Sequence, residues 1–368
     1  MTRMLVRRSV AFLLLACGWA SGAAASDRRT VVVLYSEQFL GPSTTAFTQG
    51  LREGLAFSPP TSVEAQYLDI SQFAGEAHDR ALADWLSTRY RDRRLTWIVA
   101  LGVPASVFAT RYGDAIWPGA RILHTAIDGN QVRAGAERGD LVLPRRFEYR
   151  RTVEHALQIW PDVHTVFLVA GATDQDRRWL SVAEADLAPL TDRVRVERIA
   201  DLRWDDELAK VKRMPGDSIA VGVLFGGDAD GRQFVVGDAL LDLARAANRP
   251  FFVVASPYIG TGAIGGYVLD SAEIGRLAAK VVLGAQDKPD VVNGLLTAST
   301  NRWMFDAAQL RRWNIPEAKL PAGSLVLNRE LPAWRQYLWA LLAAALLVAA
   351  QGAIIGALLV QRRNRRRV

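Results

Sequence analysis

The chain has 368 residues, half of them hydrophobic, and a formal net charge of +7. Three arginines in residues 1–8 and five in residues 362–368 exceed this charge, so the sequence between them has a net charge of −1. This distribution excludes the broad basic surface that nucleic-acid binding requires. The only cysteine is Cys17, so no disulfide is predicted.

The N-terminus has the pattern of a secretory signal peptide, predicted over residues 1–25. A basic start precedes a short apolar stretch at residues 10–16, and three alanines at residues 23–25 offer a cleavage site. Two variants stay open. Residues 14–17 resemble a lipoprotein cleavage box, and Arg7-Arg8 is compatible with a twin-arginine signal. Each variant predicts export of the chain.

Strand and helix patterns then alternate along the chain. The first series has expected strands at residues 30–35, 63–68, 97–101 and 121–126, with helices at 43–56, 76–90 and 104–112. Ser43 or Thr44 is the expected N-cap of the first helix. After a break near residues 139–149, the second series has expected helices at 149–160, 175–188, 205–212, 231–246 and 270–283. Its expected strands are 165–170, 194–199, 218–224 and 251–255, and residues 266–269 and 295–304 are expected to be extended.

This alternation predicts an α/β fold with parallel sheets flanked by helices. Two series predict two lobes: residues 26–145, and residues 146–328 with crossover segments that return to the first lobe. A juxtamembrane linker (329–337), a transmembrane helix (338–360) and a basic cytoplasmic tail (361–368) are expected to follow. Residues 338–360 carry no charge and are long enough to span the ~30 Å hydrocarbon core.

The arginines of the tail orient the helix by the positive-inside rule. The sequence therefore predicts a single-pass protein of the inner (cytoplasmic) membrane whose main domain is extracytoplasmic. Gly352 and Gly356 form a G-x-x-x-G pattern, which favours a homodimer through the membrane helix. Small residues are common in membrane helices in any case, so an unpaired helix is the alternative.

Short motifs recur in a characteristic order along the extracytoplasmic part. They occupy residues 34–37, 100–105, 169–172, 176–180, 265–270, 273–275, 309–315 and 320–324. In this order they resemble the ABC-transporter substrate-binding family, with a type I periplasmic-binding-protein fold. The form they resemble most is the sensor domain of bacterial histidine kinases. Asn314 departs from the family, which often has glycine there, but asparagine also tolerates a left-handed backbone.

The resemblance implies a small-molecule ligand, of unknown identity, held between two lobes. Sensor members continue into a cytoplasmic signalling region, whereas only eight residues follow the predicted span. We therefore expect a separate cytoplasmic signalling partner or a truncated sensor kinase. The alternative is a tethered substrate-binding component of an ABC transporter, with an ABC permease as its partner.

Ligands of α/β sheets bind beyond the carboxyl ends of the strands. The candidate ligand-binding residues at those ends are Ser36, Glu37, Gln38, Gly102, Pro104, Gly171, Thr173, Asp174, Phe225, Asp228, Ser256 and Tyr258. Their mixture of acidic, hydroxyl and aromatic groups suits a small zwitterion or an aromatic solute. Pro104 opens a helix whose first N–H groups could hold a carboxylate or phosphate, or it only initiates the helix. Asp228 either contacts the ligand or belongs to a turn in which Asp230 caps the next helix.

The sequence context of three other motifs argues against the functions that they suggest. The G-x-G-x-x-G at residues 260–265 precedes an extended stretch rather than a helix, which argues against a nucleotide site. Residues 226–231 lack the ligand spacing of a calcium loop. The four histidines, His78, His124, His155 and His164, have no metal-binding spacing, and His155 is expected at the surface or an edge. We therefore expect no cofactor, no metal and no enzymatic activity.

Overall fold

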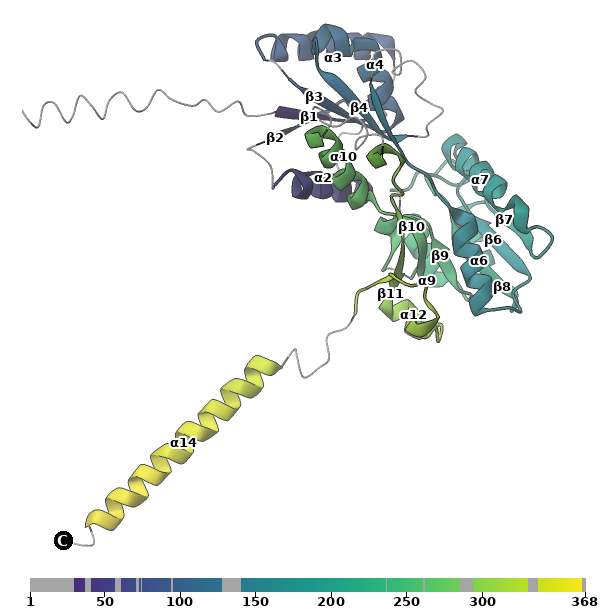
Figure 1. Cartoon of the computed structure of the whole chain (residues 1–368). Coiled ribbons are helices and arrows are strands. Elements are labelled where there is room, and N and C mark those ends of the chain that lie inside the picture. The colour runs from purple at the N-terminus through teal and green to yellow at the C-terminus, as the bar shows by residue number, and fades with distance from the viewer. Residues whose placement is uncertain are drawn as a thin grey trace, which may run out of the picture.

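The computed structural model describes residues 30–36, 41–56, 61–70, 73, 75–93, 95–127, 140–235, 237–260, 262–284, 294–329 and 337–365. The predicted signal peptide, Glu37, Gln38, most of the predicted linker and the last three residues lie outside this part of the chain. The described residues form two α/β lobes and one long apolar helix (Figure 1).

The N-terminal lobe has a five-stranded parallel sheet in the order β2-β1-β3-β4-β5. Its strands are β1 (Thr30–Tyr35), β2 (Ser62–Tyr67), β3 (Trp97–Leu101), β4 (Arg121–Ile127) and β5 (Leu141–Pro144), and its helices are α2 (Pro42–Leu55), α3 (Glu76–Tyr90) and α4 (Val103–Ile116). In β1, Val31 and Val33 face one apolar core and Val32 and Leu34 face another. A run of β-branched residues suits this strand because both of its faces are buried.

The C-terminal lobe has a four-stranded parallel sheet in the order β7-β6-β8-β9. Its strands are β6 (Thr165–Val169), β7 (Arg195–Ile199), β8 (Ser218–Gly222) and β9 (Phe251–Val253), flanked by α6 (Tyr149–Ile159), α7 (Asp174–Leu187), η2 (Ala188–Leu190), α8 (Trp204–Val211) and α9 (Asp238–Ala246). A further sheet contains β10 (Gly265–Leu269), β11 (Asn301–Asp306) and β12 (Leu325–Leu327), with η3 (Ser256–Tyr258), α12 (Ala307–Arg312) and η4 (Glu317–Lys319) nearby in the chain. Strands β10 and β11 pair antiparallel, a departure from the expected parallel pairing.

Helix α10 (Ser271–Gly284) follows β10 but packs against α2 of the N-terminal lobe (Figure 1). The two backbones approach closely because glycines lie at the contact. A methyl group on Gly275 would collide with the carbonyl oxygen of Phe47, and one on Gly50 would collide with that of Ala272. The second half of the chain thus contributes a helix to the core of the first lobe.

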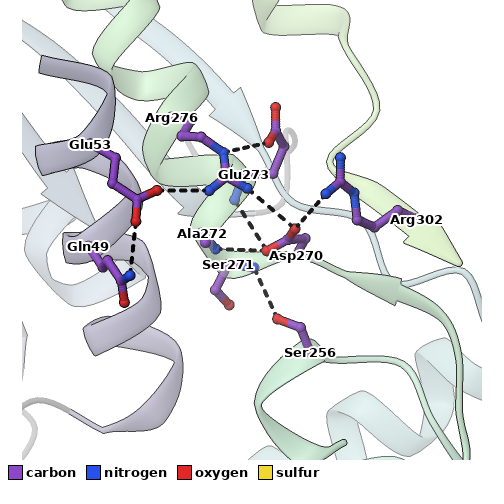
Figure 2. Close-up of polar contacts among 9 residues, drawn as sticks. All are labelled: Gln49, Glu53, Ser256, Asp270, Ser271, Ala272, Glu273, Arg276 and Arg302. Atoms are coloured by element: carbon purple, nitrogen blue, oxygen red, sulfur yellow. Dashed lines mark hydrogen bonds and ion pairs between the residues drawn. The ribbon is translucent and has the colours of Figure 1, made fainter. Parts of the chain in front are cut away.

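Among the described residues, the chain crosses between the lobes near Arg146, near Asp270 and near Thr300, and hydrogen bonds tie these crossing segments together. The Asp270 backbone N–H donates to Thr300 O at 3.0 Å, and Asn301 Nδ2 donates to Arg146 O at 2.9 Å. Figure 2 shows the Asp270 carboxylate accepting from the N–H of Ala272 at the start of α10 and pairing with arginine side chains.

The ion pairs of Asp270 reach toward β11 on one side and toward α10 and α2 on the other (Figure 2). Arg302 of β11 lies 3.5 Å and Arg276 of α10 lies 3.6 Å from one oxygen of Asp270. Arg276 also pairs with Glu53 of α2 at 3.2 Å. One buried carboxylate therefore connects both lobes where the chain crosses between them.

Several expectations at the level of elements were wrong. The helix expected from residue 231 begins only at Asp238 with Gly237 as its N-cap, because residues 227 and 233 form a bridge that keeps the preceding segment extended. Helix α2 begins at Pro42 after Gly41, so neither Ser43 nor Thr44 is its N-cap. Residues 294–297 form a helical turn, and the extended segment begins at Asn301.

Two expectations concerned single residues. His155 was expected at the surface or an edge, but only 6 % of it is exposed. Its ring lies on the inner face of α6 against Trp303, with ring centres 5.1 Å apart, and burial lowers its pKa. Asn314 has a φ of 53°, which confirms that asparagine takes the left-handed position after α12.

Candidate ligand-binding cleft

A cavity of about 390 Å³ lies between the two lobes. Its walls come from the carboxyl ends of β1 and β3, from residues 222–224 at the end of β8, from residues 254–255 after β9, and from crossing segments. Small-molecule sites in proteins have volumes of roughly 300–1,000 Å³. The cavity is therefore large enough for a small solute and too small for a macromolecule.

The N-terminal wall is built around Ser36 and the turn that follows β3. Ser36 Oγ donates to Leu101 O at 3.3 Å and accepts from the Ala105 N–H at 3.1 Å, which ties the end of β1 to the start of α4. Gly102 has a φ of 83°, and this left-handed conformation lets the chain turn directly into α4. Both α2 and α4 begin at the cavity, where the partial positive charge of a helix N-terminus favours negative groups.

The C-terminal wall is aromatic. Phe147, Tyr149, Trp179 and Tyr258 all line the cavity. Tyr149 is 1 % exposed, whereas Phe147, Trp179 and Tyr258 are half-buried. Aromatic faces of this kind offer a large apolar contact area with little loss of side-chain entropy.

Arg145 is the only cationic side chain among the described residues that line the cavity. Its guanidinium carbon lies 4.7 Å from the ring centre of Trp179 and 5.6 Å from that of Phe147. Such stacking holds the guanidinium plane in place. Burial raises the pKa of Tyr258 to about 12 and also that of Tyr149, while the charge of Arg145 acts in the opposite direction. Both phenols are therefore neutral at pH 7.

Some of the sequence-derived candidates meet at this cavity and others do not. Ser36, Gly102, Pro104 and Tyr258 line it. The cavity lining does not include Gly171, Thr173, Asp174, Phe225, Asp228 or Ser256. Glu37 and Gln38 lie outside the described residues.

Three of the remaining candidates lie at or just before the N-terminus of α7. Thr173 caps this helix by a reciprocal pair of hydrogen bonds with Asp176, at 3.1 and 3.0 Å. Asp174 points to solvent and pairs with Arg177 at 3.2 Å. Gly171 leaves space for the Asp176 carboxylate, which a methyl group would meet.

The other three have structural partners elsewhere. Phe225 is fully buried between Trp204 and Phe234. Asp228 closes a turn, because its carboxylate accepts from three backbone N–H groups. Ser256 Oγ accepts from the Ser271 N–H at 3.4 Å beside the crossing segments.

Arg145, Phe147, Tyr149 and Trp179 were missed by the sequence reasoning. They lie on a crossing segment, at the start of α6 and within α7, rather than at the end of a recognised strand. The preceding strand, β5, was itself not predicted because it has only four residues. The available signal was the alternation of Arg145, Phe147 and Tyr149, which places their side chains on one side of an extended segment.

Two α/β lobes, joined by crossing segments around a cleft, define a type I periplasmic-binding-protein-like fold. Among solved structures, a protein described as an ABC domain in complex with L-Trp, from Streptococcus pneumoniae, is similar with a TM-score of 0.54 and 13% identity, over 82% of this chain and 100% of that one. A ligand-free, open substrate-binding protein with adhesive properties from Clostridium difficile is also similar, with a TM-score of 0.54 and 13% identity over 82% of this chain and 100% of that one. A conserved domain protein from Vibrio cholerae has a TM-score of 0.50 and 18% identity, covering 81% and 99%. The sequence matches no protein-family model and no curated protein.

Proposed function

We propose that this chain is a membrane-anchored extracytoplasmic sensor that binds a small solute between its two lobes. The observation that carries the proposal is the cavity of about 390 Å³, which combines an aromatic wall, one arginine and two helix N-termini. The fold supports a binding role, since it is shared with substrate-binding proteins such as the one from Clostridium difficile. L-Trp in the Streptococcus pneumoniae structure is an example of a ligand of the expected size.

Membrane anchoring is supported by α14 (Leu338–Arg365). Within its stretch Leu338–Arg363, an 18-residue window has a mean hydropathy of 2.3, and none of that window is buried inside the structure. A helix of this length extends ~40 Å at ~1.5 Å per residue, enough to cross a bilayer. A core helix of a soluble protein would bury this apolar surface within its own fold, whereas a lipid bilayer would remove it from water here.

Ligand binding would act by closing the lobes. A ligand that contacts both walls binds the closed arrangement better than the open one and shifts the population toward it. The crossing segments, tied together around Asp270, are the natural hinge for this motion. Closure would change the direction in which the chain leaves the C-terminal lobe, and the membrane helix would carry that change to a cytoplasmic signalling partner.

The binding proposal is tested with the full-length protein in detergent micelles. Thermal unfolding is measured with separate panels of amino acids, nucleosides, sugars and aromatic acids. A ligand at ~100 times its Kd stabilises the folded state by ~2.7 kcal/mol, so the Tm of the protein rises by several degrees. Failure of every panel would contradict the proposal.

A cavity-filling variant controls for binding elsewhere. Leu224→Trp adds bulk to a cavity-lining position, whereas Val182→Trp makes a similar change at an exposed position of α7. We expect the first variant to abolish the ligand-induced rise in Tm and the second to keep it. The alternative role in transport would be supported by co-purification with an ABC permease whose transport activity depends on this chain.

A further inference from the structure

A buried carboxylate lies where the chain passes from β10 to α10. One oxygen of Asp270 accepts from the N–H groups of Ala272 and Glu273, at 3.0 and 3.3 Å. This is the arrangement of a helix N-cap, so it fixes the carboxylate to the start of α10. The other oxygen lies 3.5 Å from the guanidinium of Arg302 on β11 (Figure 2). Asp270 thus joins the start of a helix to an arginine of a neighbouring strand.

The two partners of this ion pair belong to different lobes. Helix α10, which Asp270 caps, packs against α2 and contributes to the core of the N-terminal lobe. Arg302 lies on β11, where Phe305 is buried in the core of the C-terminal lobe and Trp303 packs against that core. A rotation of one lobe relative to the other therefore moves Arg302 relative to Asp270.

The partners also differ in exposure. The side chain of Asp270 is 8 % exposed and that of Arg302 is 42 % exposed. Arg276, at 3.6 Å from the same oxygen, belongs to α10 itself and stays with Asp270 in any rotation of the lobes. Of these two arginines, Arg302 is the one whose distance the lobes control. Moving it away weakens the compensation of a buried negative charge, which is unfavourable.

The ion pair adjoins the cavity. Leu269 and Ser271, the chain neighbours of Asp270, both line the cavity. The N–H of Ser271 also donates to Ser256 Oγ at 3.4 Å, which is a second polar link between α10 and the C-terminal lobe. A solute that touches Ser271 contacts the segment that carries Asp270. Occupancy of the cavity and formation of the ion pair are therefore coupled.

We propose that the Asp270–Arg302 ion pair is an electrostatic latch, which holds the lobes in the arrangement described here and lowers the population of other arrangements. The inference concerns the regulation of the solute-binding site and rests on the proposed function for its use, whereas the latch itself acts without a ligand. An ion pair with a partly exposed member changes an equilibrium by roughly two- to fivefold. The apparent affinity for a solute changes by up to the same factor.

The experiment measures the separation of the lobes by single-molecule fluorescence energy transfer on the full-length protein in detergent, with no solute added. Dyes are attached at Asp84→Cys on α3 and Val182→Cys on α7, which are exposed positions in different lobes. Cys17, the only native cysteine, is replaced by serine. The ratio of the lobe arrangements is read from the distribution of transfer efficiencies.

Two substitutions break the ion pair from opposite sides. We expect Arg302→Gln to shift the ratio of lobe arrangements by roughly two- to fivefold. Asp270→Asn is expected to shift it in the same direction, because asparagine still caps α10 but carries no charge. Arg245→Gln is the matched control. It removes a pair with Asp242 at 3.0 Å that lies within α9, and it is expected to leave the ratio unchanged.

Salt provides a second measurement on the unmodified ion pair. Raising the NaCl concentration from about 0.05 M to about 0.5 M shortens the Debye length from ~14 Å to ~4 Å. Because Arg302 is partly exposed, this change is expected to shift the ratio toward that of Arg302→Gln. The same change is expected to have little effect on the Arg302→Gln protein.

An unchanged ratio in Arg302→Gln or in Asp270→Asn would overturn the latch, and so would an equal shift in Arg245→Gln. If a variant does not fold, the salt series on the unmodified ion pair decides, and a ratio that is insensitive to salt would overturn the latch. The binding proposal fails separately. A protein that binds no solute but shows the shifted ratios keeps the latch, whereas a solute-binding protein with unchanged ratios loses only the latch.

Discussion

At the scale of single residues, several polar side chains that suggest ligand contacts instead hold the chain together. Asp176 is fully buried and accepts from the Gly226 N–H at 3.0 Å with each of its two oxygens. Asp228 accepts from the N–H groups of Trp204, Asp230 and Arg232 at 2.9–3.2 Å. Buried carboxylates with this many backbone donors contribute to the stability of the fold.

The first prediction concerns Asp228. Asp228→Ala leaves three backbone N–H groups without their acceptor, and we expect the free energy of unfolding to fall by about 2–4 kcal/mol. Asp230→Ala in the same turn removes only an exposed pair with Arg203 and is expected to cost less than about 1 kcal/mol. Chemical denaturation measures both. A loss of ligand affinity without a loss of stability in Asp228→Ala would show that this residue contacts the ligand.

The second prediction concerns Glu207 of α8, which is fully buried. Burial raises its pKa to about 9, and the negative charges of Asp176 and Asp228 add to this effect. The folded state thus keeps a proton that the unfolded state, with a pKa near ~4.3, releases. The stability that the protonated Glu207 contributes to the folded state is fully present below pH ~4.3. It is lost as the pH rises toward 9, at up to ~1.4 kcal/mol of unfolding free energy per pH unit.

The measurement compares the wild type with Glu207→Gln, which is uncharged at every pH. From pH 5 to pH 8 we expect the wild type to lose roughly 2–4 kcal/mol of unfolding free energy relative to the variant. Denaturation at several pH values measures this difference. Parallel stability curves for the two proteins would show that Glu207 does not hold a proton in the folded state.

At the scale of elements, amphipathic patterns predicted most helices and strands but not how they approach one another. Helix α3 has the predicted bounds, because its apolar positions repeat at helical spacing and it packs by one face. The contact between α2 and α10 depends on glycines 225 positions apart in the chain, Gly50 and Gly275. No local pattern indicates that these two glycines meet.

The third prediction tests this contact. Gly275→Ala places a methyl group against the backbone of α2, and we expect it to lower the free energy of unfolding by roughly 1–3 kcal/mol or more. Gly284→Ala is the matched control at the end of the same helix, where nothing lies within 4 Å of the added methyl group. It is expected to stabilise by up to about 1 kcal/mol. Equal effects of the two substitutions would contradict close packing at Gly275.

At the scale of the whole molecule, the described part of the chain contains the cleft between the lobes and, further along the sequence, the long apolar helix α14. Helix α14 exposes a continuous apolar surface on all sides. Nothing lies within 4 Å of a methyl group added to Gly352 or Gly356 within this one chain. A partner helix could therefore approach that face closely.

The fourth prediction is that Gly352→Ile combined with Gly356→Ile disrupts pairing in the membrane. Disulfide cross-linking of a Tyr337→Cys background measures it, and we expect the cross-linked fraction to fall roughly fivefold because the bulky side chains separate the helices. Ala350→Ile adds one bulky side chain on another face of the helix and is expected to leave cross-linking unchanged. If the glycine double substitution behaves like Ala350→Ile, the helices do not pair through this face.

The sequence by itself determined the α/β class, most element positions and the apolar C-terminal helix, because these follow from local periodicity and run length. Residues 30–35 predict a buried strand without any knowledge of their neighbours. Only the tertiary structure decided which polar and aromatic residues share the cleft. Arg145 and Trp179 are 34 positions apart, yet their side chains stack at 4.7 Å. Asp228 lies six residues beyond the end of β8 and closes a turn, because the nearest unpaired backbone donors decide where a buried carboxylate lies.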